Sequence, residues 1–386
     1  MAQASASARI PVTVVTGFLG AGKTTLLRHL LLHSGQKLAV LVNEFGEVGI
    51  DGALLRSCGF CPEEDVEGRL VELTNGCLCC TVQEDFLPTM TALLERAGDL
   101  DGIVVETSGL ALPVPLVEAF QWPEIRTRTR INGVVTVVDG EALAAGHVVA
   151  ARQALDAQRQ ADPSLDHLDD IEGLFDDQLR AADLVLISRA DRLDEASLAA
   201  IQEPLRGRVR AGTVLLPMER GTIDPSVVLG LGTEASAEAA DQDHRGQAQR
   251  PPGDHGHAEA HPANGTPEDE ADGHHHHHNH HHVPMESVAI QLAGNYNRSR
   301  LETVLKEQIR DQVLIRVKGQ LQQPDRPHPL QIQAVGPRIE CWYERVQPGP
   351  PADSAERAAP GLRLVALGLK VSAPDLTQAL TAALET

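Results

Sequence analysis

The first residues of this chain that could do chemistry form a phosphate-binding motif. Gly17 to Thr24 read Gly-Phe-Leu-Gly-Ala-Gly-Lys-Thr, a complete GxxxxGKT, between the apolar run Ile10 to Val15 and the helical stretch Lys23 to His33. A glycine loop between strand and helix turns backbone N–H groups and the helix dipole toward an anion. The residues predicted to surround a nucleoside triphosphate are Gly17, Gly20, Ala21, Gly22, Lys23, Thr24 and Thr25. Within this set, Lys23 is expected to reach the β- and γ-phosphates and Thr24 to hold Mg²⁺. A chance glycine turn is the alternative.

The cysteines form a second candidate site. Five of the six lie between residues 58 and 80, as Cys58-Gly-Phe-Cys61 and Cys77-Leu-Cys79-Cys80. In a reducing compartment, thiols this close in sequence are more often metal ligands or redox centres than disulfides. The second group follows the turn sequence Thr-Asn-Gly, which places it on a loop. We interpret Cys77, Cys79 and Cys80 as metal ligands, with buried inert thiols as the alternative, and leave the role of the first pair open.

The composition limits the class of protein. The 386 residues allow two or three domains, 42% of them are hydrophobic, and no apolar stretch approaches the roughly 20 residues that cross a bilayer. Met1 to Ser7 is a short Ala/Ser tail and not a secretory signal, so we expect a cytoplasmic protein with no membrane partner. The net charge of -21 argues against nucleic acid as a partner, because phosphate backbones attract basic surfaces.

Residues 233–282 cannot build a hydrophobic core. They contain no Val, Ile, Leu, Met, Phe, Trp or Tyr, and ten acidic residues against two arginines, which predicts a disordered linker. Twelve of the 17 histidines lie here, including His274 to His278 and His280 to His282. Such an imidazole tract binds Zn²⁺, Co²⁺, Ni²⁺ or Cu²⁺ loosely. A neutral spacer is the alternative; a purification tag fits poorly, because foldable sequence follows the tract.

Apolar runs alternate with helical patterns before this linker, which is typical of an α/β fold with a parallel sheet covered on both faces. The expected strands are Ile10 to Val15, Leu38 to Val42, Leu70 to Leu73, Gly102 to Val105, Gly133 to Val138, Leu184 to Ile187 and Thr213 to Leu216. The expected helices are Lys23 to His33, Glu84 to Ala97, Leu174 to Ala181 and Glu195 to Glu203.

After the linker, shorter runs alternate like half-buried strands. These runs are Ser287 to Leu292, Leu314 to Val317, Leu330 to Val335, Arg338 to Tyr343 and Leu362 to Leu367, with helices at Leu301 to Arg310 and Asp375 to Leu384. We expect a P-loop GTPase domain at residues 1–232, an acidic His-rich linker at 233–285 and a small α+β domain at 286–386. Cys341 is interpreted as core packing.

Further candidate side chains follow the expected strands, whose carboxyl ends meet at one edge of the sheet. Glu106 is expected near Mg²⁺ and the γ-phosphate, and Gly109 to offer an amide to that phosphate. Ser188, Arg189 and Asp191 are expected to read the base, with Asp191 accepting the N1–H and N2–H₂ of guanine. This segment departs at two positions from the Asn-Lys-x-Asp of P-loop GTPases, so a surface turn is its alternative.

Together these motifs resemble the CobW family of metal-chaperone GTPases over nearly the whole chain. The likeness rests on Gly17 to Thr25, Asn43 to Gly46 with Asp51, Gly76 to Cys80, Glu106 to Leu110, the His-rich linker and the α+β tail. The resemblance implies GTP hydrolysis by a SIMIBI-class P-loop protein, with Lys23 and Glu106 in catalysis and the cargo metal at the cysteine loop. Family members that supply cobalt for cobalamin biosynthesis are the best match, with zinc chaperones close.

The resulting hypothesis couples nucleotide to metal. With Mg²⁺ and GTP bound, Asn43 to Asp51 and Glu106 to Leu110 are expected to close and bring Cys77, Cys79, Cys80 and Glu44 around Zn²⁺ or Co²⁺. Hydrolysis then releases the metal to a client metalloprotein or a cobalt-inserting enzyme, with a nucleotide-dependent homodimer as a further expectation. The alternatives are a His-rich metal buffer or sensor with a GTPase switch, a thiol redox relay, and a small-molecule kinase.

Overall fold

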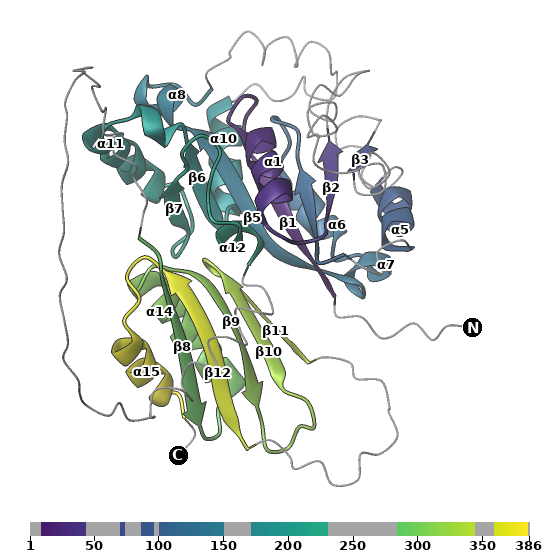
Figure 1. Ribbon diagram of the computed structural model, residues 1–386, viewed down its shortest axis with the longest axis vertical. Coiled ribbons are helices and arrows are strands. Elements are labelled where there is room, and N and C mark those ends of the chain that lie inside the picture. The colour runs from purple at the N-terminus through teal and green to yellow at the C-terminus, as the bar shows by residue number, and fades with distance from the viewer. Residues whose placement is uncertain are drawn as a thin grey trace, which may run out of the picture.

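Two sheets, one above the other in Figure 1, form the described part of the chain. The computed structural model describes residues 9–43, 70–73, 86–95, 100–149, 171–230, 284–343 and 359–384. The first sheet has seven strands and the second has five. The expected parallel α/β domain followed by a small α+β domain is therefore confirmed.

All strand pairs of the first sheet are parallel, in the order β3-β2-β4-β1-β5-β6-β7. The strands are β1 (Ile10–Thr16), β2 (Leu38–Asn43), β3 (Leu70–Leu73), β4 (Gly102–Glu106), β5 (Thr129–Asp139), β6 (Leu184–Ser188) and β7 (Val214–Pro217). Every expected strand is present, but β5 begins at Thr129 and not at Gly133. Its pairing with β1 shifts register between Val12 and Thr13, so Asn132 is the extra residue of a bulge.

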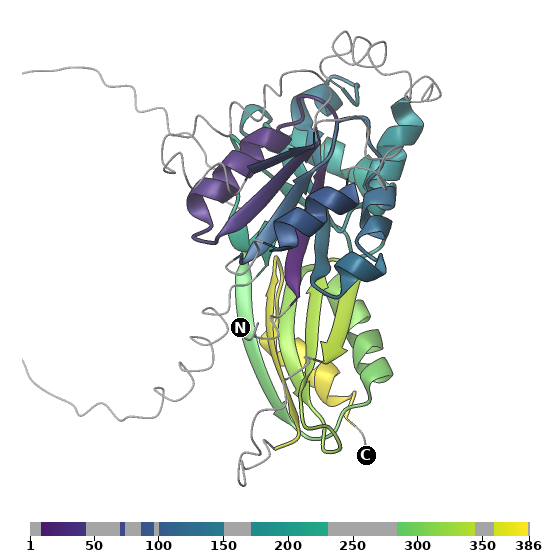
Figure 2. The ribbon, with the colours of Figure 1, turned by 90° about the vertical axis from the view of Figure 1, so that its right-hand side faces the viewer.

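Helices cover both faces of this sheet (Figures 1 and 2). In β6, Leu184 and Leu186 face one hydrophobic cluster, while Val185 and Ile187 face another, because successive strand residues point to opposite sides. The helices are α1 (Lys23–His33), α5 (Leu87–Glu95), α6 (Pro113–Ala119), α7 (Pro123–Arg126), α8 (Gly140–Ala144), α10 (Ile171–Ala181), α11 (Glu195–Arg206) and α12 (Pro225–Leu229), with the 3₁₀ turn η4 (Ala190–Arg192).

The helices expected at Leu301 to Arg310 and Asp375 to Leu384 are seen as Arg298–Asp311 and Ala373–Thr381. In the first domain, the helix boundaries differ from expectation in three places. Helix α10 begins at Ile171, α11 extends to Arg206, and the helix expected over residues 84–97 is seen as Leu87–Glu95, with residues 84, 85, 96 and 97 outside the described ranges. The short helices α6, α7, α8 and α12 are additional. Three of them carry Pro in the first turn, where the missing N–H costs nothing.

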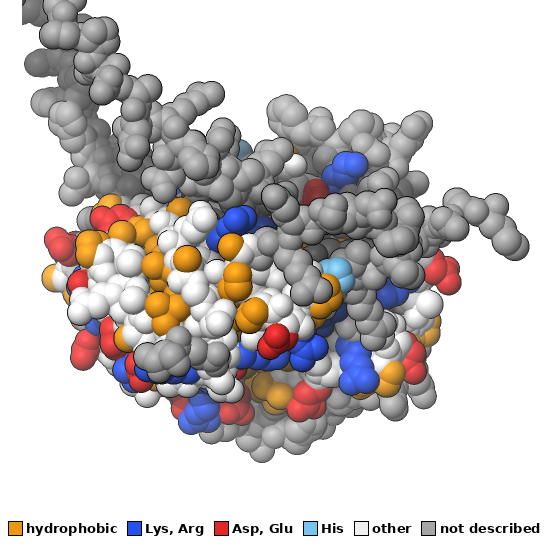
Figure 3. Space-filling model, turned by 90° about the horizontal axis from the view of Figure 1, so that it is seen from below, with side chains coloured by type: hydrophobic (Ala, Val, Ile, Leu, Met, Phe, Trp, Pro, Cys, Tyr) orange, Lys and Arg blue, Asp and Glu red, His pale blue; other side chains and the backbone are white. Residues whose placement is uncertain are grey.

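The second sheet is antiparallel, with strand order β11-β10-β9-β12-β8. Its elements are β8 (Glu286–Ala293), α14 (Arg298–Asp311), β9 (Leu314–Gln322), β10 (Leu330–Val335), β11 (Arg338–Tyr343), β12 (Gly361–Gly368) and α15 (Ala373–Thr381). Leucines of both helices share one hydrophobic cluster with the strands, and Cys341 packs against it. Seen from below, hydrophobic side chains of the surface lie among polar and charged ones (Figure 3). No described helix has the length and apolar character of a membrane span.

A polar network joins the two sheets at the amino ends of β5 and β6. Arg316 of β9, 2% exposed, donates from Nε to the Val227 carbonyl at 2.8 Å and from Nη1 to the Asn132 carbonyl at 3.0 Å. Buried Asp183 accepts from the Val134 amide at 2.8 Å and from Arg338 Nε of β11 at 2.6 Å. Burial lowers the pKa of Arg316 to about 9. The second domain is thus anchored through buried Arg316 and through Arg338, whose partner Asp183 is buried.

Candidate functional site

The glycine loop between β1 and α1 is shaped by backbone that other residues adopt poorly. Gly17, Gly20 and Gly22 have φ values of 134°, 77° and 102°. A Cβ on Gly17 would lie 2.1 Å from the Val137 carbonyl oxygen, so the loop approaches β5 as closely as only glycine permits. Helix α1 begins at Lys23, directly after this loop. The geometry is that of a phosphate-binding loop.

The Lys23 side chain lies back over this loop. Its Nζ donates to the carbonyl oxygens of Gly17 at 2.8 Å and Phe18 at 3.1 Å, and the residue is 6% exposed. Phosphate oxygens can take the place of these carbonyl oxygens and accept stronger, charge-assisted hydrogen bonds from Lys23. The ammonium group is therefore already beside the position that the sequence assigns to the β- and γ-phosphates.

Thr24 and Glu106 are brought together at the carboxyl edge of the sheet. Thr24 Oγ1 donates to Glu106 Oε1 at 3.1 Å, and Glu106, the last residue of β4, is 4% exposed. A hydroxyl and a carboxylate at the start of a helix form the hard oxygen pair that Mg²⁺ prefers. The residues present therefore fit this ion.

Thr107 supports that arrangement, although the sequence analysis gave it no role of its own. Its amide donates to the Val15 carbonyl at 2.9 Å, and its Oγ1 donates to Thr16 Oγ1 at 2.9 Å. These bonds tie the end of β4 to the end of β1. The signal was available in sequence, because a hydroxyl residue follows Glu106 at the end of an apolar strand. Gly109 lies close by, since a Cβ there would be 2.6 Å from the Leu19 amide nitrogen.

The segment expected to read the base also lies at this edge. Ser188 ends β6, and its Oγ donates to the Val138 carbonyl at 3.1 Å. Arg189 has a positive φ of 54°, pairs with Asp139 and donates from Nη2 to the Gly20 carbonyl at 2.9 Å. The guanidinium links the base segment to the phosphate loop, and its partner Asp139 is the last residue of β5.

Asp191 faces the loop that follows β7. Its Oδ1 accepts from the Arg220 amide at 3.1 Å, and its side chain is 22% exposed. The same loop touches Thr25, because a Cβ on Gly221 would lie 2.4 Å from Thr25 Cγ2. The Arg220 amide thus orients Oδ1, and Oδ2 lies 3.8 Å from Nε of the exposed Arg220 side chain, a contact that a ligand can replace.

The metal-binding predictions fall elsewhere in the chain. Glu44, Cys58, Cys61, Cys77, Cys79, Cys80 and the histidine tract lie outside the described residues. Within the described ranges, no group of three or more His, Cys, Asp or Glu side chains is placed to hold a metal ion. The structure does describe the two strands that lead into the segments of Glu44 and of the cysteine loop. Asn43 of β2 pairs with Leu73 of β3, so residues 44 and 74 both follow strand ends at the nucleotide edge.

Comparisons with known proteins agree in both domains. Residues 11–214 match the family described as CobW/HypB/UreG, nucleotide-binding domain, and residues 285–384 match the Cobalamin synthesis protein cobW C-terminal domain. A protein of Pseudomonas aeruginosa named Zinc chaperone CobW is 44% identical over 88% of this chain and 84% of its own length. A Sinorhizobium protein of the same name is 38% identical over 94% and 93%. Zinc-regulated GTPase metalloprotein activator 1 of Schizosaccharomyces pombe is 40% identical over 34% and 32%.

Proposed function

The chain belongs to the CobW/HypB/UreG family of GTPases, and from this premise we propose that it is a GTP-driven chaperone whose cargo is zinc. The observation that carries the proposal is the grouping of Lys23, Thr24 and Glu106 around the glycine loop at the strand ends. Zinc is favoured over cobalt because the relatives that match along most of their length are named zinc chaperones. Cobalt delivery for cobalamin biosynthesis stays a prediction.

In the proposed reaction, Lys23 turns from the Gly17 and Phe18 carbonyls to the β- and γ-phosphates of GTP. Its charge then opposes the charge that develops on the phosphate oxygens during hydrolysis. Thr24 Oγ1 and the Glu106 carboxylate would hold Mg²⁺, which when bound neutralises phosphate charge. We also assign Glu106 the role of orienting the attacking water, because its buried carboxylate ends β4 beside the phosphate loop.

Base selection is assigned to Asp191, whose carboxylate accepts the N1–H and N2–H₂ of guanine. Adenine offers no donor at those two positions, so it would leave the carboxylate unpaired. Ser188 and Arg189 position this segment through their bonds to the Val138 and Gly20 carbonyls. The link from Arg189 to Gly20 couples base binding to the phosphate loop.

The cargo site of the proposal consists of Cys77, Cys79, Cys80 and Glu44. Neighbouring strands β2 and β3 support its position, because residues 44 and 74 follow strand ends at the edge that carries Lys23. Thiolates and a carboxylate give a tetrahedral site suited to Zn²⁺. The proposal also includes release of the bound Zn²⁺ to a client metalloprotein and a homodimer in the GTP state. It divides the chain into a GTPase domain at residues 1–232, a linker at 233–285 and a second domain at 286–386.

Replacing the central thiol tests this assignment. In the Cys79→Ala variant, we expect Zn²⁺ affinity to lose its dependence on GTP, while GTP affinity stays within about 3-fold of wild type, since the phosphate contacts are untouched. Cys341→Ala is the matched control, because this thiol packs in the second domain. Zn²⁺ titration with a chromophoric chelator measures both. Retained GTP-dependent Zn²⁺ binding in Cys79→Ala would overturn the cargo site.

A further inference from the structure

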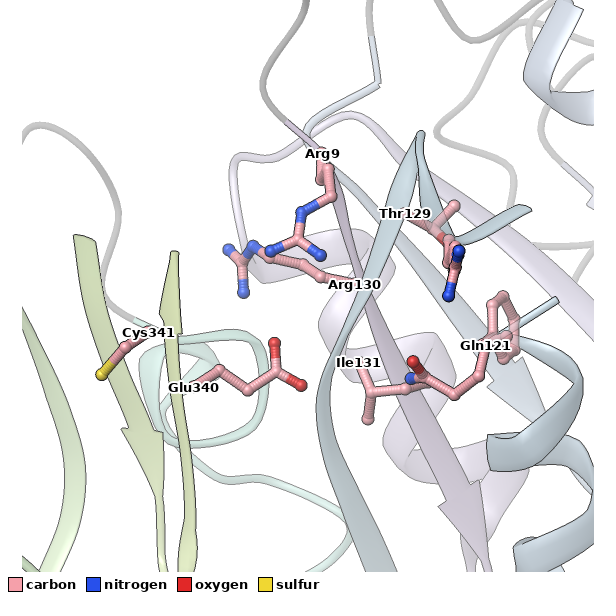
Figure 4. A pocket seen from close by; sticks show the side chains of 9 residues that line it. Arg9, Gln121, Thr129, Arg130, Ile131, Glu340 and Cys341 are labelled. Carbon is pink, nitrogen blue, oxygen red and sulfur yellow. The ribbon is translucent and has the colours of Figure 1, made fainter. Parts of the chain in front are cut away.

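A cavity of about 260 Å³ lies at the joint between the two sheets (Figure 4). Arg9, Arg126 and Arg130 contribute from the first domain, next to the amino ends of β1 and β5, and Glu340 and Cys341 contribute from β11. The P-loop follows the opposite, carboxyl end of β1. The cavity is therefore separate from the nucleotide site.

The charged groups that line this cavity are unbalanced. Three are guanidinium groups, and Glu340 is the one carboxylate among the described lining residues; in Figure 4 it extends toward the side of the cavity that holds Arg9 and Arg130. Across the described ranges, Arg9, Arg126 and Arg130 make no ion pair and no side-chain hydrogen bond. The cavity thus carries an excess of two positive charges.

Two of these cations share one aromatic ring. The guanidinium carbons of Arg9 and Arg130 lie 5.3 and 5.0 Å from the ring centre of Trp342, the neighbour of Cys341 on β11. Contact with a ring face holds a guanidinium in place and leaves the N–H groups in the guanidinium's own plane available to a ligand. Burial, with Arg9 adding to it, lowers the pKa of Arg130 to about 10, although Glu340 opposes this. The charge of Arg130 is therefore incompletely compensated.

We propose that this cavity binds a doubly charged oxyanion, namely a phosphate group, free or as a small monoester. Guanidinium groups recognise phosphate oxygens through paired hydrogen bonds, and two negative charges match the excess of the cavity. A water molecule occupies about 30 Å³ of liquid, so the volume accommodates a phosphate with several waters. A bound phosphate would hold Arg9 and Arg130 of the first domain beside the β11 strand of the second.

Calorimetric titration with inorganic phosphate tests this proposal. The full chain is first saturated with a non-hydrolysable GTP analogue and Mg²⁺, so that the β- and γ-phosphate positions of the P-loop are both occupied, and ionic strength is held constant. We expect one phosphate per chain. Arg130→Gln and Arg9→Gln should each weaken binding at least 10-fold, because each removes one guanidinium group. Glu340→Gln should tighten binding, because it removes the opposing charge. Arg206→Gln is the matched control, since this exposed arginine of α11 pairs with Glu203.

Glu340→Gln should tighten phosphate binding, whereas the Arg9 and Arg130 variants should weaken it. A folding defect would weaken phosphate binding in every variant, so the two explanations give different results. Absence of saturable binding in the wild type loaded with the GTP analogue overturns the proposal. Equal affinities in the wild type and Arg130→Gln also overturn it. Phosphoserine titrated in parallel identifies the source. Affinity equal to that of phosphate supports a monoester ligand, and affinity at least 10-fold weaker supports free phosphate. The test does not depend on the proposed metal delivery.

Discussion

The two edges of the seven-stranded sheet are built in different ways. At the carboxyl edge, Lys23 contacts backbone carbonyls of a glycine loop, and Thr24 contacts a carboxylate, so each bond can be exchanged for one to a ligand. At the amino edge, Arg316 and Asp183 fill their hydrogen bonds with groups of both domains. One edge is organised for exchange of partners and the other for permanent attachment.

The largest expected effect is at the carboxyl edge. Lys23→Ala removes the charge that faces the phosphates, and we expect the kcat of GTP hydrolysis to fall roughly 100-fold or more, the cost of losing one such donor. Steady-state phosphate release measures this. Unfolding free energy from urea titration should change by less than about 1 kcal/mol, because the carbonyls of Gly17 and Phe18 that accept from Lys23 lie in the glycine loop, where water can replace the ammonium group. A loss of folding that matches the loss of activity would contradict this division.

The amino edge should show the reverse pattern. Arg316→Ala leaves the Val227 and Asn132 carbonyls buried without a donor, and we expect a loss of about 3 kcal/mol in unfolding free energy. The kcat of GTP hydrolysis should stay within about 3-fold of wild type in the folded fraction. Arg363→Ala is the control, because this arginine is exposed on the neighbouring strand β12. A collapse of hydrolysis in fully folded Arg316→Ala protein would show that the edges are coupled.

The next prediction concerns selection of the base, which also takes place at the carboxyl edge. In Asp191→Asn, the amide cannot accept both guanine donors, and we expect GTP affinity to fall roughly 10- to 100-fold, while affinity for xanthosine triphosphate rises. Fluorescent-nucleotide competition measures both. Equal weakening toward both nucleotides would mean that Asp191 serves only to hold the Arg220 loop.

The smallest expected effect concerns Cys341 in the second domain. Burial raises the pKa of its thiol to about 12, so the folded chain keeps the proton at pH values where the unfolded chain loses it. The stability contributed by this group is therefore present below the unfolded pKa and declines as the pH rises from about 8.5 toward 12. Partial exposure limits the loss at pH 9.5 to about 1 kcal/mol or less.

The measurement compares wild type with Cys341→Ala in urea at pH 7.5 and pH 9.5 without metal, so that the other thiols cancel. The wild type should lose more stability over this interval than the variant does. An identical pH dependence in the two proteins would contradict the shifted pKa. Cys79→Ala should keep the wild-type dependence on pH, since Cys341 is intact.

Most of the fold was predictable from local sequence patterns. Every strand of both sheets was predictable, because buried strands are continuous aliphatic runs and half-buried ones alternate. The P-loop was readable for the same reason, since strand, glycines and helix are adjacent. The short helices were not predicted because four to seven residues show too little helical periodicity, although Pro113, Pro123 and Pro225 marked three starts.

Contacts between residues distant in sequence were not predictable. Arg316 interrupts an apolar strand, and a charged residue at such a position is expected to face solvent. It is instead buried, because it donates to Asn132, which is 184 residues away in the sequence. The pairing of Arg189 with Asp139, 50 residues apart, was hidden in the same way. The bulge at Asn132 arises from pairing between two strands, which neither strand's own pattern reveals. The roles of Glu44 and the cysteine loop remain predictions, because they lie outside the described residues.

Competitive Zn²⁺ and Co²⁺ affinity in the two nucleotide states tests the central claim most directly. The full chain and a variant lacking residues 244–282 are titrated with Mg²⁺ and a non-hydrolysable GTP analogue, and then with GDP. We expect the GTP analogue to raise Zn²⁺ affinity about 100-fold in both proteins, a coupling of about 2.7 kcal/mol, with Zn²⁺ bound more tightly than Co²⁺. Zn²⁺ affinity that is the same in both nucleotide states would contradict nucleotide-gated delivery.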